Sequence, residues 1–188
     1  MSNQGEPNYD YLLNFIIIGD DLVGKSNLSS HYVDGQFNPE YESTIGCEFA
    51  VKNVIIRNTT YHIQIWDTAG HKNFRAITRS YYKFTACAFV VYDISNRNSF
   101  NNVGTWIEDC RNNSSEKIFM VLIGNKSDLA DKRQVSTEEG RELAEKYEMK
   151  FYETSAKTGD EIAKKMDQNY YDLEKDKCGI KKVDKKQN

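Results

Sequence analysis

Short apolar runs alternate with amphipathic stretches along most of this chain. The runs at 12–18, 87–93 and 118–124 are almost purely apolar, which is typical of parallel strands buried on both faces. Apolar residues recur at helical spacing between the runs, so strands alternate with helices and the sheet is predicted to be mostly parallel. The predicted strands cover 12–18, 47–56, 61–66, 87–93, 118–124 and 151–153, and the predicted helices cover 24–33, 99–111, 137–147 and 161–174.

The polar turn at 57–60 joins two of these strands directly and predicts a β-hairpin, which introduces one antiparallel strand. The helix at 137–147 can use Ser136 or Thr137 as its N-cap, and acidic residues follow in its first turn. In a mostly parallel sheet, ligands bind at the carboxyl ends of the strands. Polar motifs follow several of the apolar runs, so we expect the functional site at that edge of the sheet.

The segment at 19–26 reads G-D-D-L-V-G-K-S and matches the phosphate-binding pattern G-x-x-x-x-G-K-S/T. It follows a predicted strand and opens a predicted helix, where backbone N–H groups and the helix N-terminus can surround phosphates. Lys25 would reach the β and γ phosphates, and Ser26 would bind Mg²⁺. A strand–turn–helix with an incidental lysine is the plainer interpretation. The nucleotide-binding residues predicted from this loop are Asp21, Leu22, Val23, Gly24, Lys25, Ser26 and Asn27.

Two positions inside this loop are unusual, because Asp21 and Leu22 replace the small residues that such loops often carry. A carboxylate about 6 Å from a phosphate charge would cost about 3 kcal/mol at an effective dielectric constant near 20. Either Asp21 points into water, or the loop binds phosphate less well than usual.

The motif D-T-A-G at 67–70 follows the predicted strand at 61–66. Asp67 is suited to holding Mg²⁺ through water, and the N–H of Gly70 can approach a γ-phosphate because glycine has no side chain. Thr44 offers a hydroxyl to the same ion from a polar loop, although a solvated loop threonine is the plainer interpretation. The predicted metal ligands are Ser26, Thr44 and Asp67.

N-K-S-D at 125–128 and T-S-A-K at 154–157 follow the last two predicted strands. Asp128 can accept two hydrogen bonds from guanine N1–H and its amino group, whereas adenine would leave this carboxylate unpaired. Taken alone, N-K-x-D also fits a polar loop with a capping aspartate. The Ala156 N–H would donate to guanine O6. The residues predicted to contact the base or to hold its loops are Phe37, Asn125, Lys126, Asp128, Ser155, Ala156 and Lys157.

These four motifs in this order, with Thr44 between the first two, resemble those of the Rab family of Ras-like small GTPases over residues 9–174. The resemblance implies a P-loop NTPase fold of class α/β, with a six-stranded, mostly parallel sheet, one antiparallel strand and about five helices on both faces. It also implies a guanine-nucleotide switch that uses GTP/GDP and Mg²⁺. We expect a flexible N-terminus at 1–9, the GTPase domain at 10–174 and a Lys-rich flexible tail at 175–188.

By the same resemblance, switches around 41–49 and 69–82 would change with the bound nucleotide, and Tyr41 would close over the phosphates. Phe49, Trp66 and Tyr81 match an aromatic triad that effector proteins read, while ordinary core aromatics are the plainer interpretation. An exchange factor and an activating protein would act on the switches. We expect a monomer that serves vesicle trafficking.

The sequence departs from the family at a catalytic position. The family usually has Gln directly after D-T-A-G to orient the attacking water, and here that residue is His71. A neutral histidine also offers one donor and one acceptor, but on a rigid ring. With Lys25, Thr44 and Gly70 as the other catalytic residues, we predict slow GTP hydrolysis. The alternative is a non-hydrolysing, nucleotide-bound scaffold, or pseudo-GTPase.

The formal net charge of −3 gives no general attraction to nucleic acid. Cys47, Cys87, Cys110 and Cys178 lack C-x-x-C spacing, which indicates a reducing, cytoplasmic compartment. Rabs usually end in prenylated cysteines, and Cys178 is too far from the end of this chain to serve as such an anchor. The Lys-rich tail would either contact an anionic membrane surface or remain solvated. We therefore expect a cytoplasmic protein that is peripheral to endomembranes if its native C-terminus is lipidated.

Overall fold

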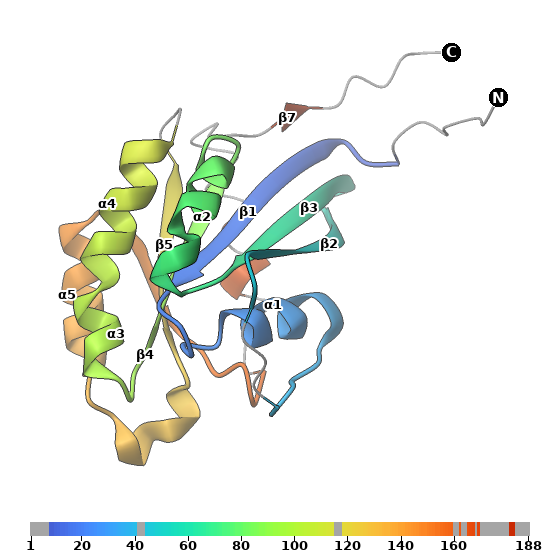
Figure 1. Cartoon of the computed structure of the whole chain (residues 1–188). Coiled ribbons are helices and arrows are strands. Elements are labelled where there is room, and N and C mark those ends of the chain that lie inside the picture. Colours follow the sequence, from blue (N-terminus) through green and yellow to red (C-terminus); the bar gives the residue numbers. More distant parts are fainter. Residues whose placement is uncertain are drawn as a thin grey trace, which may run out of the picture.

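A twisted β-sheet forms the centre of the molecule and carries helices on both of its faces (Figure 1). The computed structural model describes residues 8–40, 44–114, 118–159, 162, 165–167, 169 and 181–182. The strand order is β2-β3-β1-β4-β5-β6, and along this path only β2 and β3 pair antiparallel. The strands are β1 (Tyr11–Gly19), β2 (Cys47–Ile56), β3 (Thr59–Thr68), β4 (Cys87–Asp93), β5 (Phe119–Asn125), β6 (Lys150–Glu153) and β7 (Lys181–Lys182).

The central strand β1 contributes to the core on both faces of the sheet. Phe15 and Ile17 pack in the core on the α1 side, whereas Ile16 and Ile18 pack in the core on the opposite side. Because both faces are covered, the sequence shows a continuous apolar run instead of alternation. The strand ends at Gly19, where φ is 145° and a Cβ would lie 2.2 Å from the backbone oxygen of Val91. No side chain fits at this position.

The strands β2 and β3 form the predicted hairpin in continuous antiparallel register. Arg57 and Asn58 make a two-residue turn with φ values of 48° and 62°, the left-handed geometry of a type I′ turn. The turn is shorter than the predicted segment at 57–60 because Thr59 and Thr60 already pair with β2. The predicted six-stranded, mostly parallel sheet with one antiparallel strand is confirmed on this path.

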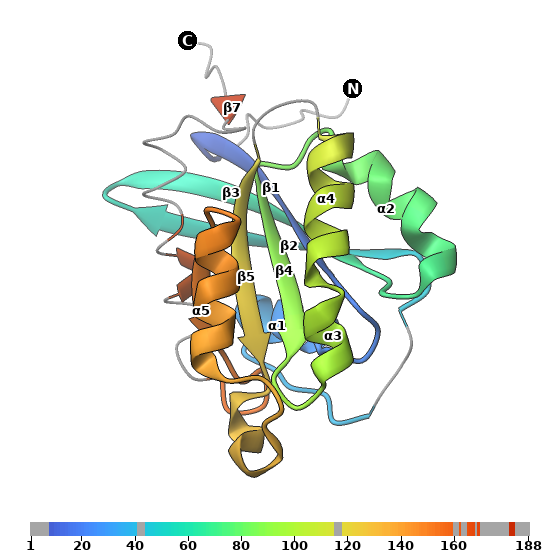
Figure 2. The same ribbon diagram turned by 90° about the vertical axis from the view of Figure 1, so that its left-hand side faces the viewer.

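Helices cover the sheet from both sides, as the turned view shows (Figure 2). The helix α1 (Lys25–Asp34) packs on one face, and α2 (Arg75–Tyr82), α4 (Val103–Asn113) and α5 (Thr137–Lys146) pack on the other. Ser136 caps α5 in a capping box with Glu139, in agreement with the predicted start of this helix. Two short 3₁₀ segments are η1 (Lys72–Phe74) and η2 (Ser127–Lys132).

Two parts of the helical prediction need correction. The predicted helix at 99–111 is two helices, α3 (Arg97–Asn101) and α4, which meet at Asn102. The pattern also does not predict α2, because Thr78 and Tyr82 are the only buried residues of this polar helix. Tertiary packing, and not local pattern, therefore places α2 on the sheet.

The C-terminal part of the chain is described at few positions. Of the predicted helix at 161–174, the described residues include Ile162 and Met166, which belong to the core on the α1 side. Within the predicted flexible tail, β7 pairs antiparallel with Tyr11 and Leu12 of β1 and so adds a seventh, two-residue strand to the sheet. None of the helices in the described ranges has the length and apolar character that a membrane span requires.

Candidate functional site

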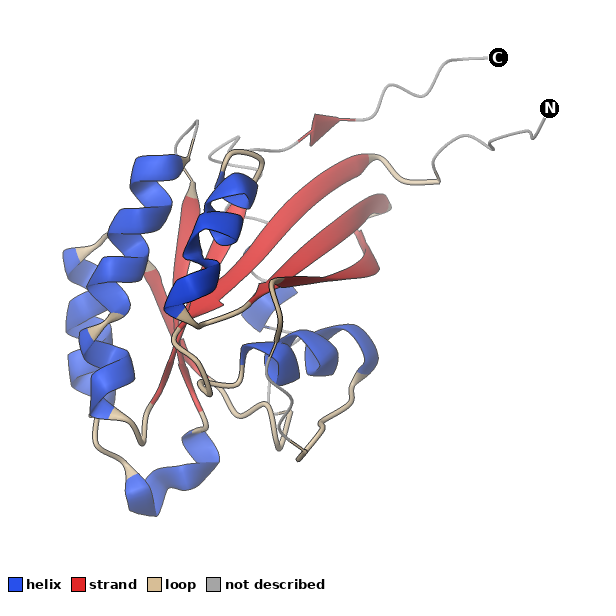
Figure 3. Cartoon of the chain, viewed as in Figure 1, coloured by secondary structure: helices blue, strands red, loops and turns tan. Residues whose placement is uncertain are grey.

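A cavity of about 600 Å³ opens at the carboxyl ends of the strands. Its walls come from the loop between β1 and α1, from α1 itself, and from the loops that precede β2 and follow β3, β5 and β6. These loops gather around the N-terminal end of α1 (Figure 3). The volume suits a nucleotide-sized ligand. The predicted site residues that line the cavity are Asp21, Leu22, Gly24, Lys25, Ser26, Asn27, Phe37, Thr44, Gly70, Asn125, Lys126, Asp128, Ala156 and Lys157.

Other predicted site residues do not line the cavity. Val23 is fully buried in the core on the α1 side, where its side chain anchors the loop. Ser155 and Asp67 are also buried and lie behind residues of the wall. His71 is exposed and lies outside the lining. Tyr41 falls outside the described residues.

Lys25, the first residue of α1, is a buried cation with 5% of its surface exposed. Its Nζ donates a hydrogen bond of 2.8 Å to the backbone oxygen of Asp20. Burial lowers the pKa of this ammonium, and the carboxylates of Asp67, Asp21 and Asp20 act in the opposite direction. A desolvated ammonium is stable only next to anions, so Lys25 is well suited to hold a phosphate at this end of the cavity.

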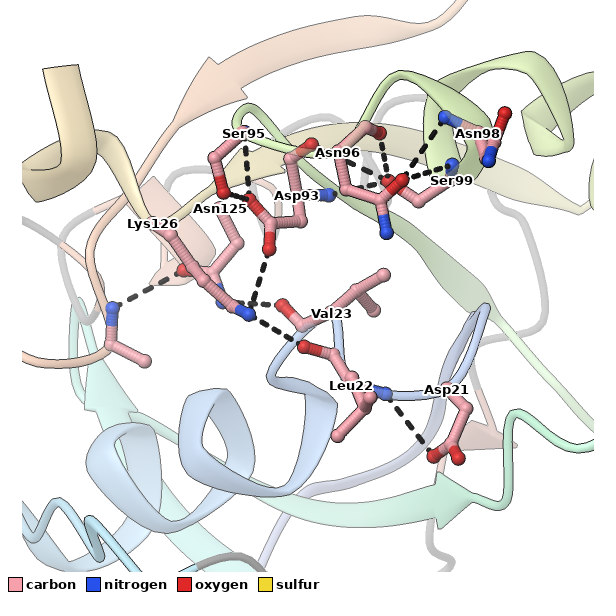
Figure 4. Close-up of polar contacts among 11 residues, drawn as sticks. Asp21, Leu22, Val23, Asp93, Ser95, Asn96, Asn98, Ser99, Asn125 and Lys126 are labelled. Carbon is pink, nitrogen blue, oxygen red and sulfur yellow. Dashed lines mark hydrogen bonds and ion pairs between the residues drawn. The ribbon is translucent and has the colours of Figure 1, made fainter. Parts of the chain in front are cut away.

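Asn125, the last residue of β5, joins three loops behind the cavity (Figure 4). Its Nδ2 donates to the backbone oxygen of Val23 at 2.8 Å, and its Oδ1 accepts from Thr154 Oγ1 at 3.3 Å and from the Ala156 N–H at 3.2 Å. A Cβ at Gly24 would lie 2.5 Å from the same Nδ2, and φ at Gly24 is 91°. The glycine therefore allows the phosphate loop to approach the Asn125 side chain.

Lys126 and Asp128 line the part of the cavity where the sequence predicts the base. The Lys126 Nζ donates to the backbone oxygen of Leu22 at 2.7 Å and pairs with Asp93 Oδ2 at 2.7 Å, so its stem lies across the phosphate loop. Ser155 Oγ donates to Asp128 Oδ1 at 2.6 Å and fixes the orientation of that carboxylate. A carboxylate held in this way can accept from the two adjacent donors on the edge of guanine.

Three oxygen-bearing side chains meet where a metal ion was predicted. Ser26 Oγ and Thr44 Oγ1 are 2.9 Å apart. Asp67 is 3% exposed, and neither of its carboxylate oxygens has a hydrogen-bond partner among the described residues. Burial raises the pKa of Asp67 to about 6, although the nearby Ser26 hydroxyl and Lys25 act to lower it.

An orphaned buried carboxylate beside two hydroxyls fits a hard divalent cation. Within the ranges that the structure describes, no group of three or more His, Cys, Asp or Glu side chains could hold a metal by itself. This agrees with Mg²⁺, which keeps several waters and binds through few protein ligands together with phosphate oxygens. The residues Ser26, Thr44 and Asp67 therefore fit the predicted ion.

The two unusual loop residues differ in how they are held. Asp21 Oδ1 accepts a hydrogen bond of 3.1 Å from the Leu22 N–H, one of the backbone donors of the phosphate loop. Leu22 has a φ of 66°, which is uncommon for a residue other than glycine, and 57% of its surface is exposed. Their side chains therefore lie at the open side of the loop.

His71 follows Gly70 of the cavity wall but does not itself line the cavity. Its Nδ1 accepts a hydrogen bond of 3.3 Å from the Asn73 N–H, and its ring lies 6.4 Å from that of Phe74. The side chain is exposed and is not part of the cavity lining.

Sequence reasoning misses two carboxylates that support the site. Asp93 pairs with Lys126, and Asp20 accepts from Trp106 Nε1 at 2.8 Å and from Asn102 Nδ2 at 2.6 Å. Both aspartates lie at the carboxyl end of a strand, β4 and β1 respectively, which is the one local signal that could have indicated them. Their partners are distant in the sequence, so the contacts themselves could not be predicted.

The aromatic residues Phe49, Trp66 and Tyr81 form one continuous cluster beside the site. The ring centroids of Phe49 and Trp66 are 4.7 Å apart, and those of Trp66 and Tyr81 are 4.5 Å apart. Phe49 is 50% exposed, and the other two are half-buried against the core on the α4 side. Phe49 therefore presents its ring to solvent, while Trp66 and Tyr81 also pack against the core.

Comparisons with known proteins identify the family of the chain. The model of the Ras family matches residues 14–175 of the chain. A protein of Dictyostelium discoideum named Ras-related protein Rab-2B is 50% identical over 151 residues, which are 80% of this chain and 75% of the relative. The chain therefore belongs to the Ras family and is a Rab-like small GTPase.

Proposed function

We propose that this protein is a Rab-type switch that binds GTP/GDP with Mg²⁺, hydrolyses GTP slowly and recruits effector proteins in vesicle trafficking. The observation that carries this proposal is the cavity itself. It brings together a buried lysine, two hydroxyls beside an orphaned carboxylate, and an oriented aspartate at the far end. These three groups support recognition of the phosphates, the metal ion and the guanine base of a nucleotide, respectively.

Guanine specificity is assigned to Asp128. Ser155 holds one of its oxygens, and the carboxylate accepts from N1–H and the amino group of the base. Adenine has no hydrogen on N1 and no amino group at C2, so it would leave the Asp128 carboxylate without these two partners. Asn125 and Lys126 keep this loop against the phosphate loop, with Phe37 and Lys157 at the rim of the same cavity.

The phosphate end is assigned to Lys25, Gly70 and the backbone of the loop at 21–27. Ser26, Thr44 and Asp67 would hold Mg²⁺, whose role is to neutralise phosphate charge. Gly70 lies close to the phosphate loop, since a Cβ there would be 2.3 Å from the Asp21 nitrogen. Because of this close approach, we assign the Gly70 N–H to the γ-phosphate, as its catalytic role together with Thr44.

Slow hydrolysis is proposed from the position of His71. A water-orienting group must present its donor and acceptor at the γ-phosphate, and a small misplacement can cost about 10²-fold in rate. The exposed ring of His71 already accepts from Asn73 and does not line the cavity. The same observation favours a second candidate, a nucleotide-bound scaffold that does not hydrolyse GTP at all, and turnover in the presence of an activating protein separates the two.

Partner binding is proposed for the surface of Phe49, Trp66 and Tyr81. Exposed aromatics are common at the centres of protein interfaces. Phe49 and Tyr81 belong to the two proposed switches, and the Trp66 ring contacts both of them. We propose that effectors bind there to the GTP form, that an exchange factor and an activating protein act on the switches, and that the protein works as a monomer at the cytoplasmic side of endomembranes.

Two measurements test the function. Denaturing the purified protein should release GDP or GTP, and adenine nucleotides would refute the assignment. Single-turnover hydrolysis should then be about tenfold to hundredfold faster in His71→Gln than in the unmodified protein. His62→Gln, a histidine substitution on β3 outside the cavity lining, should leave the rate unchanged. If His71→Gln gives no acceleration, the proposed cause of slow hydrolysis is wrong.

A further inference from the structure

One buried side chain contacts both the phosphate loop and α2. Trp106 of α4 is 1% exposed, and its indole Nε1 donates a hydrogen bond of 2.8 Å to Asp20 Oδ1. The guanidinium of Arg75, the first residue of α2, lies over its ring face at 4.5 Å from the centroid. We propose that Trp106 is a positioning residue through which the arrangement of α2 acts on the phosphate loop. This inference rests on the proposed nucleotide site.

The Asp20 side of this contact leads directly to the proposed phosphate site. Asp20 Oδ2 accepts from Asn102 Nδ2 at 2.6 Å, so both carboxylate oxygens are held by side chains next to or within α4. The backbone oxygen of the same residue accepts from Lys25 Nζ at 2.8 Å. A displacement of Asp20 therefore changes the position of the ammonium that is proposed to bind the β and γ phosphates.

The Arg75 side leads to a segment proposed to change with the nucleotide. Arg75 Nε is buried and has no hydrogen-bond partner among the described residues, so the ring of Trp106 is the contact that accounts for its position. A cation over the face of an indole draws electron density from the ring and makes its N–H a stronger donor. Arg75 on the ring thus strengthens the bond from Trp106 to Asp20, and departure of α2 weakens it.

A second contact between the same two helices serves as a matched control. Arg79 of α2 pairs with Asp109 of α4 at 2.7 Å, and α2 lies beside α4 in both views (Figures 1 and 2). In the described part of the chain, Arg79 and Asp109 bond to each other, whereas Arg75 reaches the phosphate loop through Trp106. Substitution of Arg79 therefore weakens the packing of α2 on α4 in general, whereas substitution of Arg75 also breaks the contact that leads through Trp106 to Asp20.

The test measures dissociation of fluorescent GDP and of a fluorescent, non-hydrolysable GTP analogue from the full-length protein with Mg²⁺. Arg75→Gln should change the ratio of the two dissociation rates by about fivefold to tenfold, while Arg79→Gln should leave it within about twofold. Trp106→Phe keeps the ring but removes the N–H donor, and should accelerate both dissociation rates about tenfold. In the Trp106→Phe background, Arg75→Gln should no longer change the ratio.

A spectroscopic measurement gives an independent readout. The chain has two tryptophans, so Trp66→Phe leaves Trp106 as the sole emitter. Its emission should differ between the GDP form and the analogue form, and Arg75→Gln in this background should remove the difference. A purely structural role for Trp106 would not move this signal.

Several outcomes overturn the inference. The inference is wrong if Arg75→Gln and Arg79→Gln change the ratio of dissociation rates equally, or if the effects of Arg75→Gln and Trp106→Phe are additive. It is also wrong if the emission of Trp106 is the same in both nucleotide forms. If Trp106→Phe does not fold, the comparison of Arg75→Gln with Arg79→Gln still tests whether α2 acts on the phosphate loop through Arg75. Failure of the unmodified protein to bind guanine nucleotide would refute the proposed function as well, whereas tight binding with an unchanged rate ratio refutes the coupling alone.

Discussion

Asn125 is the residue whose removal tests most directly how the site is held together. Its side chain is 1% exposed and bonds the phosphate loop at Val23 and the loop after β6 at Thr154 and Ala156. We predict that Asn125→Ala lowers the stability of the protein and accelerates release of nucleotide, because loops that are far apart in the sequence lose their common partner.

The magnitude follows from the three hydrogen bonds. At about 1 kcal/mol for each bond, with the Thr154 bond at the long end, the free energy of unfolding should fall by about 2 to 3 kcal/mol. The Val23 carbonyl and the Ala156 N–H would be left without this partner in a buried environment. Because unpaired buried polar groups are costly, we do not expect a smaller loss of stability. If the same free energy is lost from the nucleotide-bound state, GDP should dissociate about 30-fold to 150-fold faster.

The assay combines thermal unfolding of the GDP-bound protein with dissociation of fluorescent GDP. Asn125→Asp is nearly isosteric but places an oxygen against the Val23 carbonyl, so it should be at least as damaging as Asn125→Ala. Asn112→Ala, at an exposed position of α4, should change the free energy of unfolding by less than about 0.5 kcal/mol. A loss below about 1 kcal/mol in Asn125→Ala, with dissociation within twofold of the unmodified rate, would refute this reasoning.

Three further predictions concern other elements. The buried Tyr92 hydroxyl has no hydrogen-bond partner among the described residues, so Tyr92→Phe should raise the free energy of unfolding by about 1 kcal/mol in thermal denaturation, and a loss would reveal a partner. Gly24→Ala should accelerate GDP dissociation, because its Cβ would press on Asn125 and φ is 91°. Arg97, and then Ser136, lower the pKa of Glu139 from 4.5 to about 2. Because the folded pKa is the lower one, the stabilisation by Glu139 is present above about pH 4.5 and is lost as the pH falls toward 2. The Tm difference between the unmodified protein and Glu139→Gln should therefore shrink on acidification, and a constant difference would contradict the assignment.

The sheet and the loop motifs could be predicted because their causes are local. A strand buried on both faces, such as β1, needs a continuous apolar run, and the phosphate loop needs glycine where the backbone turns and approaches Asn125. A dipeptide of Arg57 and Asn58 in a left-handed turn also lies within the segment expected to turn. In each case the residues that determine the structure are neighbours in the sequence.

The rest depends on residues that are far apart in the chain. The helix α2 has only eight residues and buries only Thr78 and Tyr82, so it depends on contacts such as those of Arg75 with Trp106 and Arg79 with Asp109. The bond from Trp106 to Asp20 spans 86 positions, and no local pattern encodes such a pair. Local sequence also does not determine where an exposed loop side chain lies relative to a cavity. The finding that His71 bonds to its own loop and does not line the cavity therefore had to come from the structure.

Nucleotide binding and hydrolysis place different demands on the same cavity. The groups assigned to binding are buried and tied to one another, as with Lys25 and Asn125, so their positions are set by the fold before any ligand arrives. His71 is exposed and bonded to its own loop, and Asp21 adds a negative charge at the phosphate end. We propose that both departures act on the phosphate end of the cavity, at a distance from the contacts that hold the base. Affinity for guanine nucleotide should therefore be close to that of a small GTPase even where the hydrolysis rate is not, and the GTP form would persist for longer after each exchange.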